Sequence, residues 1–167
     1  MSTPVATFER SLHDLDVGVT RTDPDGFVET LADVIEQPAI GVSLDIEGVS
    51  LSETPVELDV TPRLLREANT GVTPAGAAIA DYGSLVVQST ASGAEPVSLY
   101  CPTHVAVVDT ADILADTAGA TDWLDGEFRQ GRDSAVLATG VSATGDMGAI
   151  VEGVHGPGTV HVVLLER

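Results

Sequence analysis

Three glycine-rich segments beside apolar runs hold most of the residues that could bind a ligand or move a proton. They cover residues 80–84, 140–148 and 153–158. In open α/β sheets, ligands bind outside the carboxyl ends of strands, where loops expose backbone N–H groups, and we expect these segments to occupy that position. The candidate ligand-binding residues are Gly83, Ser84, Gly140, Ser142, Thr144, Gly153 and Gly156, and the candidate catalytic residues are Asp81, Asp146 and His155.

The segment 140–148 begins like a phosphate-binding loop, because Gly140 and Gly145 have the G-x-x-x-x-G spacing. Asp146 stands where that motif has Lys, and a carboxylate there would repel a nucleotide's phosphates. We therefore exclude nucleotide hydrolysis. Two interpretations stay open: the hydroxyls of Ser142 and Thr144 help to hold a small anion, or these residues and Asp146 only cap a turn or helix.

His155 lies between small residues in the run Gly-Val-His-Gly-Pro-Gly. Small neighbours leave an imidazole accessible, which suits acid–base catalysis or ligand binding. Alternatively, its ring hydrogen-bonds a neighbouring loop and holds the turn in place. His104 and His161 fall within strand patterns, so we expect hydrogen-bonded residues of the core or of a sheet face.

The sequence predicts no cofactor. Its one cysteine, Cys101, excludes an internal disulfide and an iron–sulfur cluster held by cysteines of this chain alone. His and Cys spacings typical of zinc sites are missing, and covalent catalysis by Lys is impossible because the chain has none. We expect the purified chain to carry no iron, zinc or flavin.

Apolar periodicity places these residues among alternating helices and strands. Helices are expected over residues 3–15 and 23–35, from 61, and at 110–114 and 122–129. Strands are expected at 17–20, 39–44, 83–88, 97–100, 104–109, 134–139 and 159–165. Near-continuous Val and Leu runs indicate a mainly parallel sheet, and the alternation predicts one α/β domain over residues 1–167. Segments 140–148 and 153–158 each adjoin a predicted buried strand, so we expect them side by side at one end of the sheet.

The charge balance is strongly acidic, with 26 Asp and Glu against seven Arg and a net charge of −19. Acids dispersed through every segment indicate a protein adapted to high salt; an acidic interaction protein is the alternative. Nucleic acids and anionic membrane surfaces would be repelled. The N-terminus lacks a secretory signal and no apolar run is long enough to span a membrane, so we expect a cytoplasmic protein.

Residues 71–166 resemble the LUD domain family, in particular the LutC-type lactate-utilisation proteins. The resemblance lies in AAIADYGSLVV at 77–87, CPTHVAVVDTADI at 101–113, and the run from 139 to 166 that contains GVHGP. Ser142, Thr144, Asp146 and His155 match the family motifs, whereas Gly148 stands where the family has Glu.

The resemblance implies a Rossmann-like three-layer α/β/α fold, similar to the sugar-phosphate isomerase and CoA-transferase group. It also implies that the chain is an accessory or assembly subunit of an L-lactate-oxidising system and binds a small carboxylate. The redox centres of that system would then lie in partner iron–sulfur subunits. The alternative is an isomerase- or transferase-like enzyme acting on a small anionic substrate, a sugar phosphate or a CoA-linked compound, with Asp81, Asp146 or His155 as proton carrier. Either function, accessory subunit or enzyme, is compatible with a homo-oligomer.

Overall fold

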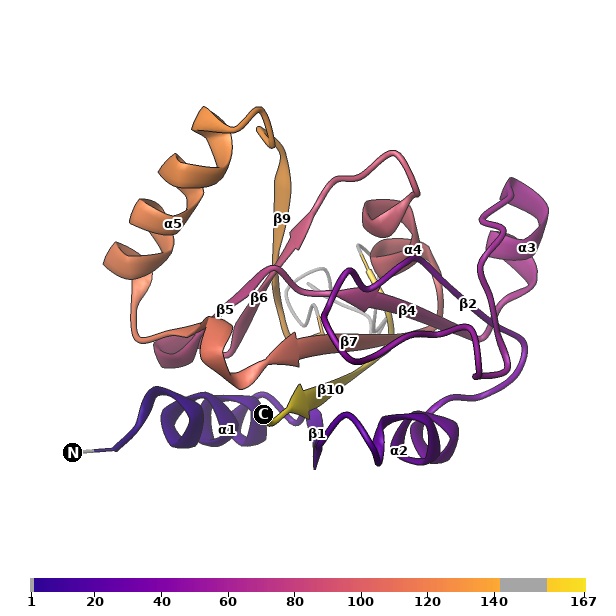
Figure 1. Ribbon diagram of the computed structural model, residues 1–167, viewed down its shortest axis with the longest axis horizontal. Coiled ribbons are helices and arrows are strands. Elements are labelled where there is room, and N and C mark those ends of the chain that lie inside the picture. Colours follow the sequence, from indigo (N-terminus) through magenta and orange to yellow (C-terminus); the bar gives the residue numbers. More distant parts are fainter. Residues whose placement is uncertain (1, 142–155) are drawn as a thin grey trace, which may run out of the picture.

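A parallel sheet forms the centre of the molecule. The computed structural model describes residues 2–141 and 156–167. Six strands lie in the order β1-β10-β7-β4-β2-β3, and all neighbouring pairs are parallel (Figure 1). Their bounds are β1 Gly18–Thr22, β10 Thr159–Leu165, β7 Thr103–Asp109, β4 Thr70–Pro74, β2 Ala39–Gly41 and β3 Val56–Glu57. The predicted α/β architecture with a mainly parallel sheet is confirmed.

A second sheet, which the sequence pattern did not reveal, packs beside the first. It has the order β8-β5-β6-β9, with bounds β8 Ile113–Leu114, β5 Ala77–Ile79, β6 Ser84–Gln88 and β9 Ala135–Thr139. β6 runs antiparallel to both β5 and β9. The runs at 83–88 and 134–139 are therefore strands, as expected, but they do not belong to the parallel sheet.

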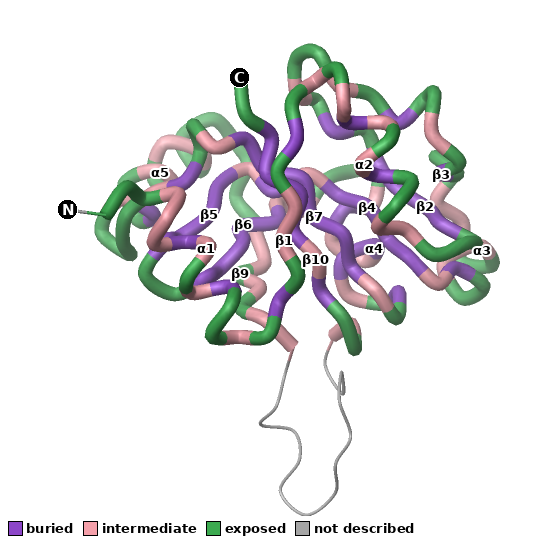
Figure 2. Tube along the Cα trace, turned by 90° about the horizontal axis from the view of Figure 1, so that it is seen from below, coloured by how far each residue is buried: buried purple, intermediate pink, exposed green. Residues whose placement is uncertain are grey.

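Helices and the second sheet cover the two faces of the central sheet. On one face, Phe27 and Leu31 of α2 (Phe27–Val34) pack against valines of β4, β7 and β10. The other face packs against α1 (Pro4–Asp14), the second sheet and α4 (Ala94–Tyr100). Helix α5 (Thr117–Arg129) lies outermost on the second sheet, and α3 (Pro62–Glu67) lies beside α4. Figure 2 shows the buried residues concentrated along the strands.

Local capping explains where the predicted helices begin. Thr3 accepts the N–H of Ala6, and Thr61 accepts that of Leu64, with a proline in the first turn after each. Asp116 accepts the N–H of Gly119, so α5 begins at Thr117, ahead of the predicted patch at 122–129. Residues 110–114 form a single 3-10 turn followed by β8, not a helix of the predicted length.

The strand predicted at residues 97–100 is wrong, because this run is the end of α4. A short apolar run has no periodicity that separates a buried strand from a buried helix. Packing against β4 permits the helix here. Gly71 of β4 lets the helix approach so closely that a Cβ at position 71 would lie 2.5 Å from the carbonyl oxygen of Val97. No helix in the described ranges 2–141 and 156–167 is long and apolar enough to cross a bilayer.

Candidate functional site

The structure describes part of the predicted site. Asp81, Gly83, Ser84, Gly140 and Gly156 are within the described residues. Ser142, Thr144, Asp146, Gly153 and His155 lie outside them, so their roles and the expected pairing of segments 140–148 and 153–158 stay predictions.

Gly83, Ser84 and Gly140 come together at one end of the second sheet. The Ser84 and Thr139 hydroxyls lie 2.6 Å apart across the β6–β9 pair. Both glycines have positive φ and pack on Leu15, just beyond the end of α1; a Cβ on Gly83 would lie 2.9 Å from the Leu15 Cδ1. These contacts give the three residues a packing role, while their ligand-binding role stays a prediction. The Asp81 side chain is exposed beside them.

Gly156 lies at the opposite edge of the central sheet from the one we expected. It precedes β10, which runs parallel to β1 and β7, so it belongs to the amino ends of these strands. The N–H of Gly158 donates to the carbonyl oxygen of Pro102, 2.8 Å away, just before the start of β7. The expectation that this segment follows the carboxyl end of a strand is therefore wrong for residues 156–158.

The carboxyl edge of the central sheet holds a crevice of about 290 Å³. The chain leaving β2, the turn after β4, the end of β6 and the turn after β7 surround it. This is the position at which α/β sheets commonly bind ligands. The lining residues are Val42, Ser43, Leu44, Asp45, Ile46, Pro74, Ala75, Gly76, Gln88, Thr90, Ser92, Ala94 and Asp112.

Hydroxyl, amide and carboxylate groups converge on the crevice. Ser43 donates to the carboxylate of Asp45 over 2.8 Å, and Asp45 has a left-handed backbone with φ of 51°, which Asp tolerates better than most residues. The hydroxyls of Thr90 and Ser92 are 2.9 Å apart. The amide of Gln88 donates to the carboxylate of Glu127 and is thereby oriented. The site is thus rich in acceptors and hydroxyls.

Asp112 is the carboxyl of this crevice whose protonation is perturbed. Asp112 is an exposed residue, but partial desolvation of its carboxyl raises its pKa, the neighbouring Asp109 carboxylate raises it further, and Arg167 opposes both effects. The Asp109 carboxylate already accepts two hydrogen bonds. One comes from the N–H of Ala111, and the other comes from Nε of Arg167, which lies 2.7 Å from the carboxylate. A carboxyl with a raised pKa in a crevice is a candidate proton donor or acceptor.

The described residues that line the crevice include no arginine. Most of the arginines already form ion pairs: Arg21 contacts Glu9 and Glu166, each at 2.6 Å, and Arg167 contacts Asp109. Asp45 and Asp112 both line the space, and Arg167, which is held by Asp109, offsets the charge of Asp112 only in part, so an anionic ligand is disfavoured there. A small neutral compound with hydroxyl groups fits the lining better.

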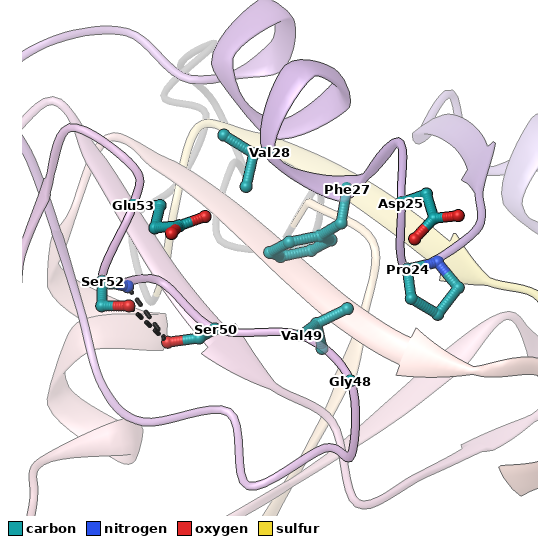
Figure 3. Close-up of a pocket in the computed structure, with 9 residues that line it drawn as sticks. All are labelled: Pro24, Asp25, Phe27, Val28, Gly48, Val49, Ser50, Ser52 and Glu53. Atoms are coloured by element: carbon teal, nitrogen blue, oxygen red, sulfur yellow. Dashed lines mark hydrogen bonds between the residues drawn. The ribbon is translucent and has the colours of Figure 1, made fainter.

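A second hollow, of about 560 Å³, lies between the start of α2 and the loop at residues 48–53 (Figure 3). Its wall includes Phe27 and Val49, and the carboxylates of Asp25 and Glu53 also line it. Ser50 and Ser52 hydrogen-bond to one another in this hollow. We take the crevice with Asp45 and Asp112 as the candidate site, because it lies at the carboxyl ends of β2, β4 and β7 and contains a carboxyl with a raised pKa.

Sequence reasoning missed both carboxylates of this crevice. Asp112 lies three residues beyond the apolar run at 104–109, so the rule about carboxyl ends of strands could have found it. Asp45 follows the strand at 39–41 in the same way. The predicted site residues came instead from the glycine-rich segments 80–84, 140–148 and 153–158.

Comparison with known proteins identifies relatives at the level of family and fold. The family model described as "LUD domain" matches residues 8–165. The crystal structure of a DUF162 family protein from Deinococcus radiodurans superposes with a TM-score of 0.77, covering 97% of this chain and 96% of that one at 20% identity. Identity this low shows a shared fold alone. No curated relative matches the sequence.

Proposed function

Because the chain belongs to the LUD domain family, we propose that it is an accessory or assembly subunit of an L-lactate-oxidising iron–sulfur system. The observation that carries this proposal is the family match over nearly the whole chain, since the family is associated with lactate utilisation. We place the protein in the cytoplasm, together with the partner subunits.

The cysteine content supports a role beside partners that carry the electrons. Iron–sulfur clusters are commonly held by several thiolates, and this chain has only Cys101. Its side chain is buried, and burial raises the pKa of the Cys101 thiol to about 11. A buried, protonated thiol is a poor ligand and a poor nucleophile. The redox centres of the proposed system therefore belong to other subunits.

The candidate crevice adds a binding function to this role. Its acceptors and hydroxyls favour a small hydroxylated, uncharged compound over lactate itself, whose carboxylate would face Asp45 and Asp112. Binding of a small carboxylate would then rest on Ser142, Thr144 and the glycines near them, outside the described residues. The position of Asp112 in the lining of this crevice, together with its raised pKa, favours a second candidate function, an isomerase-like enzyme in which this carboxyl moves a proton.

Growth on L-lactate separates the two functions. Deleting the gene from its host should abolish growth on L-lactate, leave growth on another carbon source unchanged, and be complemented by the wild-type chain. An accessory subunit should also be complemented by Asp112→Asn, which keeps the shape of the side chain and removes the proton carrier. The matched control is Asp122→Asn, at an exposed position of α5 outside the crevice.

Each outcome of this experiment has a distinct meaning. Failure of Asp112→Asn alone, with normal protein levels, would favour the enzyme. Normal growth of the deletion strain on L-lactate would contradict both forms of the lactate proposal.

A further inference from the structure

Among residues 2–141 and 156–167, nothing protects one of the four sheet edges. Exposed edges invite pairing with other chains, and proteins commonly block them with charges, prolines or very short strands. Strands β3 and β8 have two residues each, and β1 carries Arg21, which is held by Glu9 and Glu166. The fourth edge strand is β9, with five residues, neither charge nor proline, and no second strand partner within residues 2–141 and 156–167.

The side chains of β9 are apolar and partly uncovered. Leu137 is 55% exposed, and it lies opposite Val86 in register, on the face of the second sheet that α5 covers. The helix packs over β5 and β8 and diverges from β9 beyond their connecting turn (Figure 1). Phe128, near the end of α5, is 48% exposed. Within the part of the chain that the structure describes, β9 therefore presents an open apolar edge on a protein that is strongly acidic.

We propose that β9 is the edge along which two copies of this chain pair antiparallel, so that their second sheets join into one. Pairing about a twofold axis at Leu137 places Ala135 opposite the partner's Thr139 and brings the two leucines together. Such an interface is isologous, because the same patch serves both copies. The strand is self-complementary in this register, with its largest side chain at the centre and smaller ones at the ends.

The lack of charged side chains on β9 favours a second copy of this chain as its partner. Each chain carries a net charge of −19, so two copies repel one another least where the contact itself lacks carboxylates and salt screens the remaining charges. Residues 134–141 contain no charged side chain. A basic partner would be drawn to the carboxylates elsewhere on the surface, whereas the neutral edge of another copy matches β9. This proposal does not depend on the lactate function.

The oligomeric state in molar KCl tests the pairing. Sedimentation equilibrium should show a dimer, and Leu137→Glu should raise its dissociation constant at least about tenfold, because it removes the central apolar contact and places two carboxylates side by side. The matched control is Leu58→Glu, at a leucine of similar exposure (46%) away from β9. This control should dissociate like the wild type.

A cross-link keeps the test decisive if Leu137→Glu folds poorly. In a chain with Leu137→Cys, mild oxidation should give a covalent dimer, because residues opposite each other in an antiparallel pair have Cβ atoms about 5 Å apart. Cys101 is buried and does not compete, and Leu58→Cys serves as the control. A wild-type chain that stays monomeric at all concentrations, or a dimer that neither variant at position 137 affects, would overturn the proposal.

Discussion

The urea concentration at which half of the protein unfolds should rise steeply between dilute buffer and molar KCl. Of the 33 charged residues, 26 are acidic, and most of the arginines are already paired with particular carboxylates. Two unit charges about 10 Å apart in water repel by roughly 0.4 kcal/mol. Summed over many unbalanced carboxylates, this repulsion opposes the folded state by several kcal/mol on that scale.

Salt removes this penalty by shortening the screening length to about 3 Å at 1 M. Urea unfolding should therefore be followed by circular dichroism over a series of KCl concentrations. An uncharged osmolyte at matched concentrations is the control, because it changes hydration without screening. A midpoint that is independent of KCl, or that the osmolyte raises equally, would contradict adaptation to high salt.

Acid should destabilise the protein through His104, a fully buried residue of β7. Its Nε2 lies 2.8 Å from the hydroxyl of Thr73, and burial lowers the pKa of His104 to about 4, from an ordinary value of 6.5. Between these two values the unfolded chain binds a proton that the folded chain does not. The free energy of unfolding therefore falls as the pH drops from about 6.5 to about 4, by about 3 kcal/mol in total.

The matched variant for this effect is His104→Gln, which retains a hydrogen-bonding group near Thr73 but does not titrate. Protonation of the many carboxylates contributes to the pH dependence of both proteins, so it cancels in their difference. Urea unfolding in molar KCl at several pH values measures that difference. We expect the wild-type stability to fall relative to the variant over this interval. Parallel curves would show that His104 is not buried as a neutral ring.

The sequence predicted those parts of the fold that local chemistry determines. The caps at Thr3 and Thr61 and the Val-rich runs at 104–109 and 159–165 specify helices and buried strands without distant partners. Residues 97–100 could not be assigned in this way, because their helix depends on the space above Gly71. The division into two sheets also depends on pairings between distant segments, such as β6 with β9.

The candidate site was only partly predictable for a related reason. Spacing in the sequence identified glycines, of which Gly83 and Gly140 pack against Leu15, whereas Gly156 lies at the amino end of β10. Asp45 and Asp112 are far apart in the chain and line one crevice only because β2 and β7 lie in the same sheet, separated by β4. The position of Asp112 just beyond a predicted strand is visible in the sequence, but its raised pKa is not, because that depends on desolvation and on the Asp109 carboxylate in the folded chain.

Association with a lactate-oxidising system is tested most directly by affinity purification of the tagged chain from lactate-grown cells. The purification should be done in molar KCl, with a tagged, unrelated acidic protein as the control. We predict that iron–sulfur subunits co-purify, with their visible absorption and with L-lactate-dependent reduction of a dye. Recovery of the chain without these subunits and without that activity, from cells that are growing on L-lactate, would contradict the proposed role.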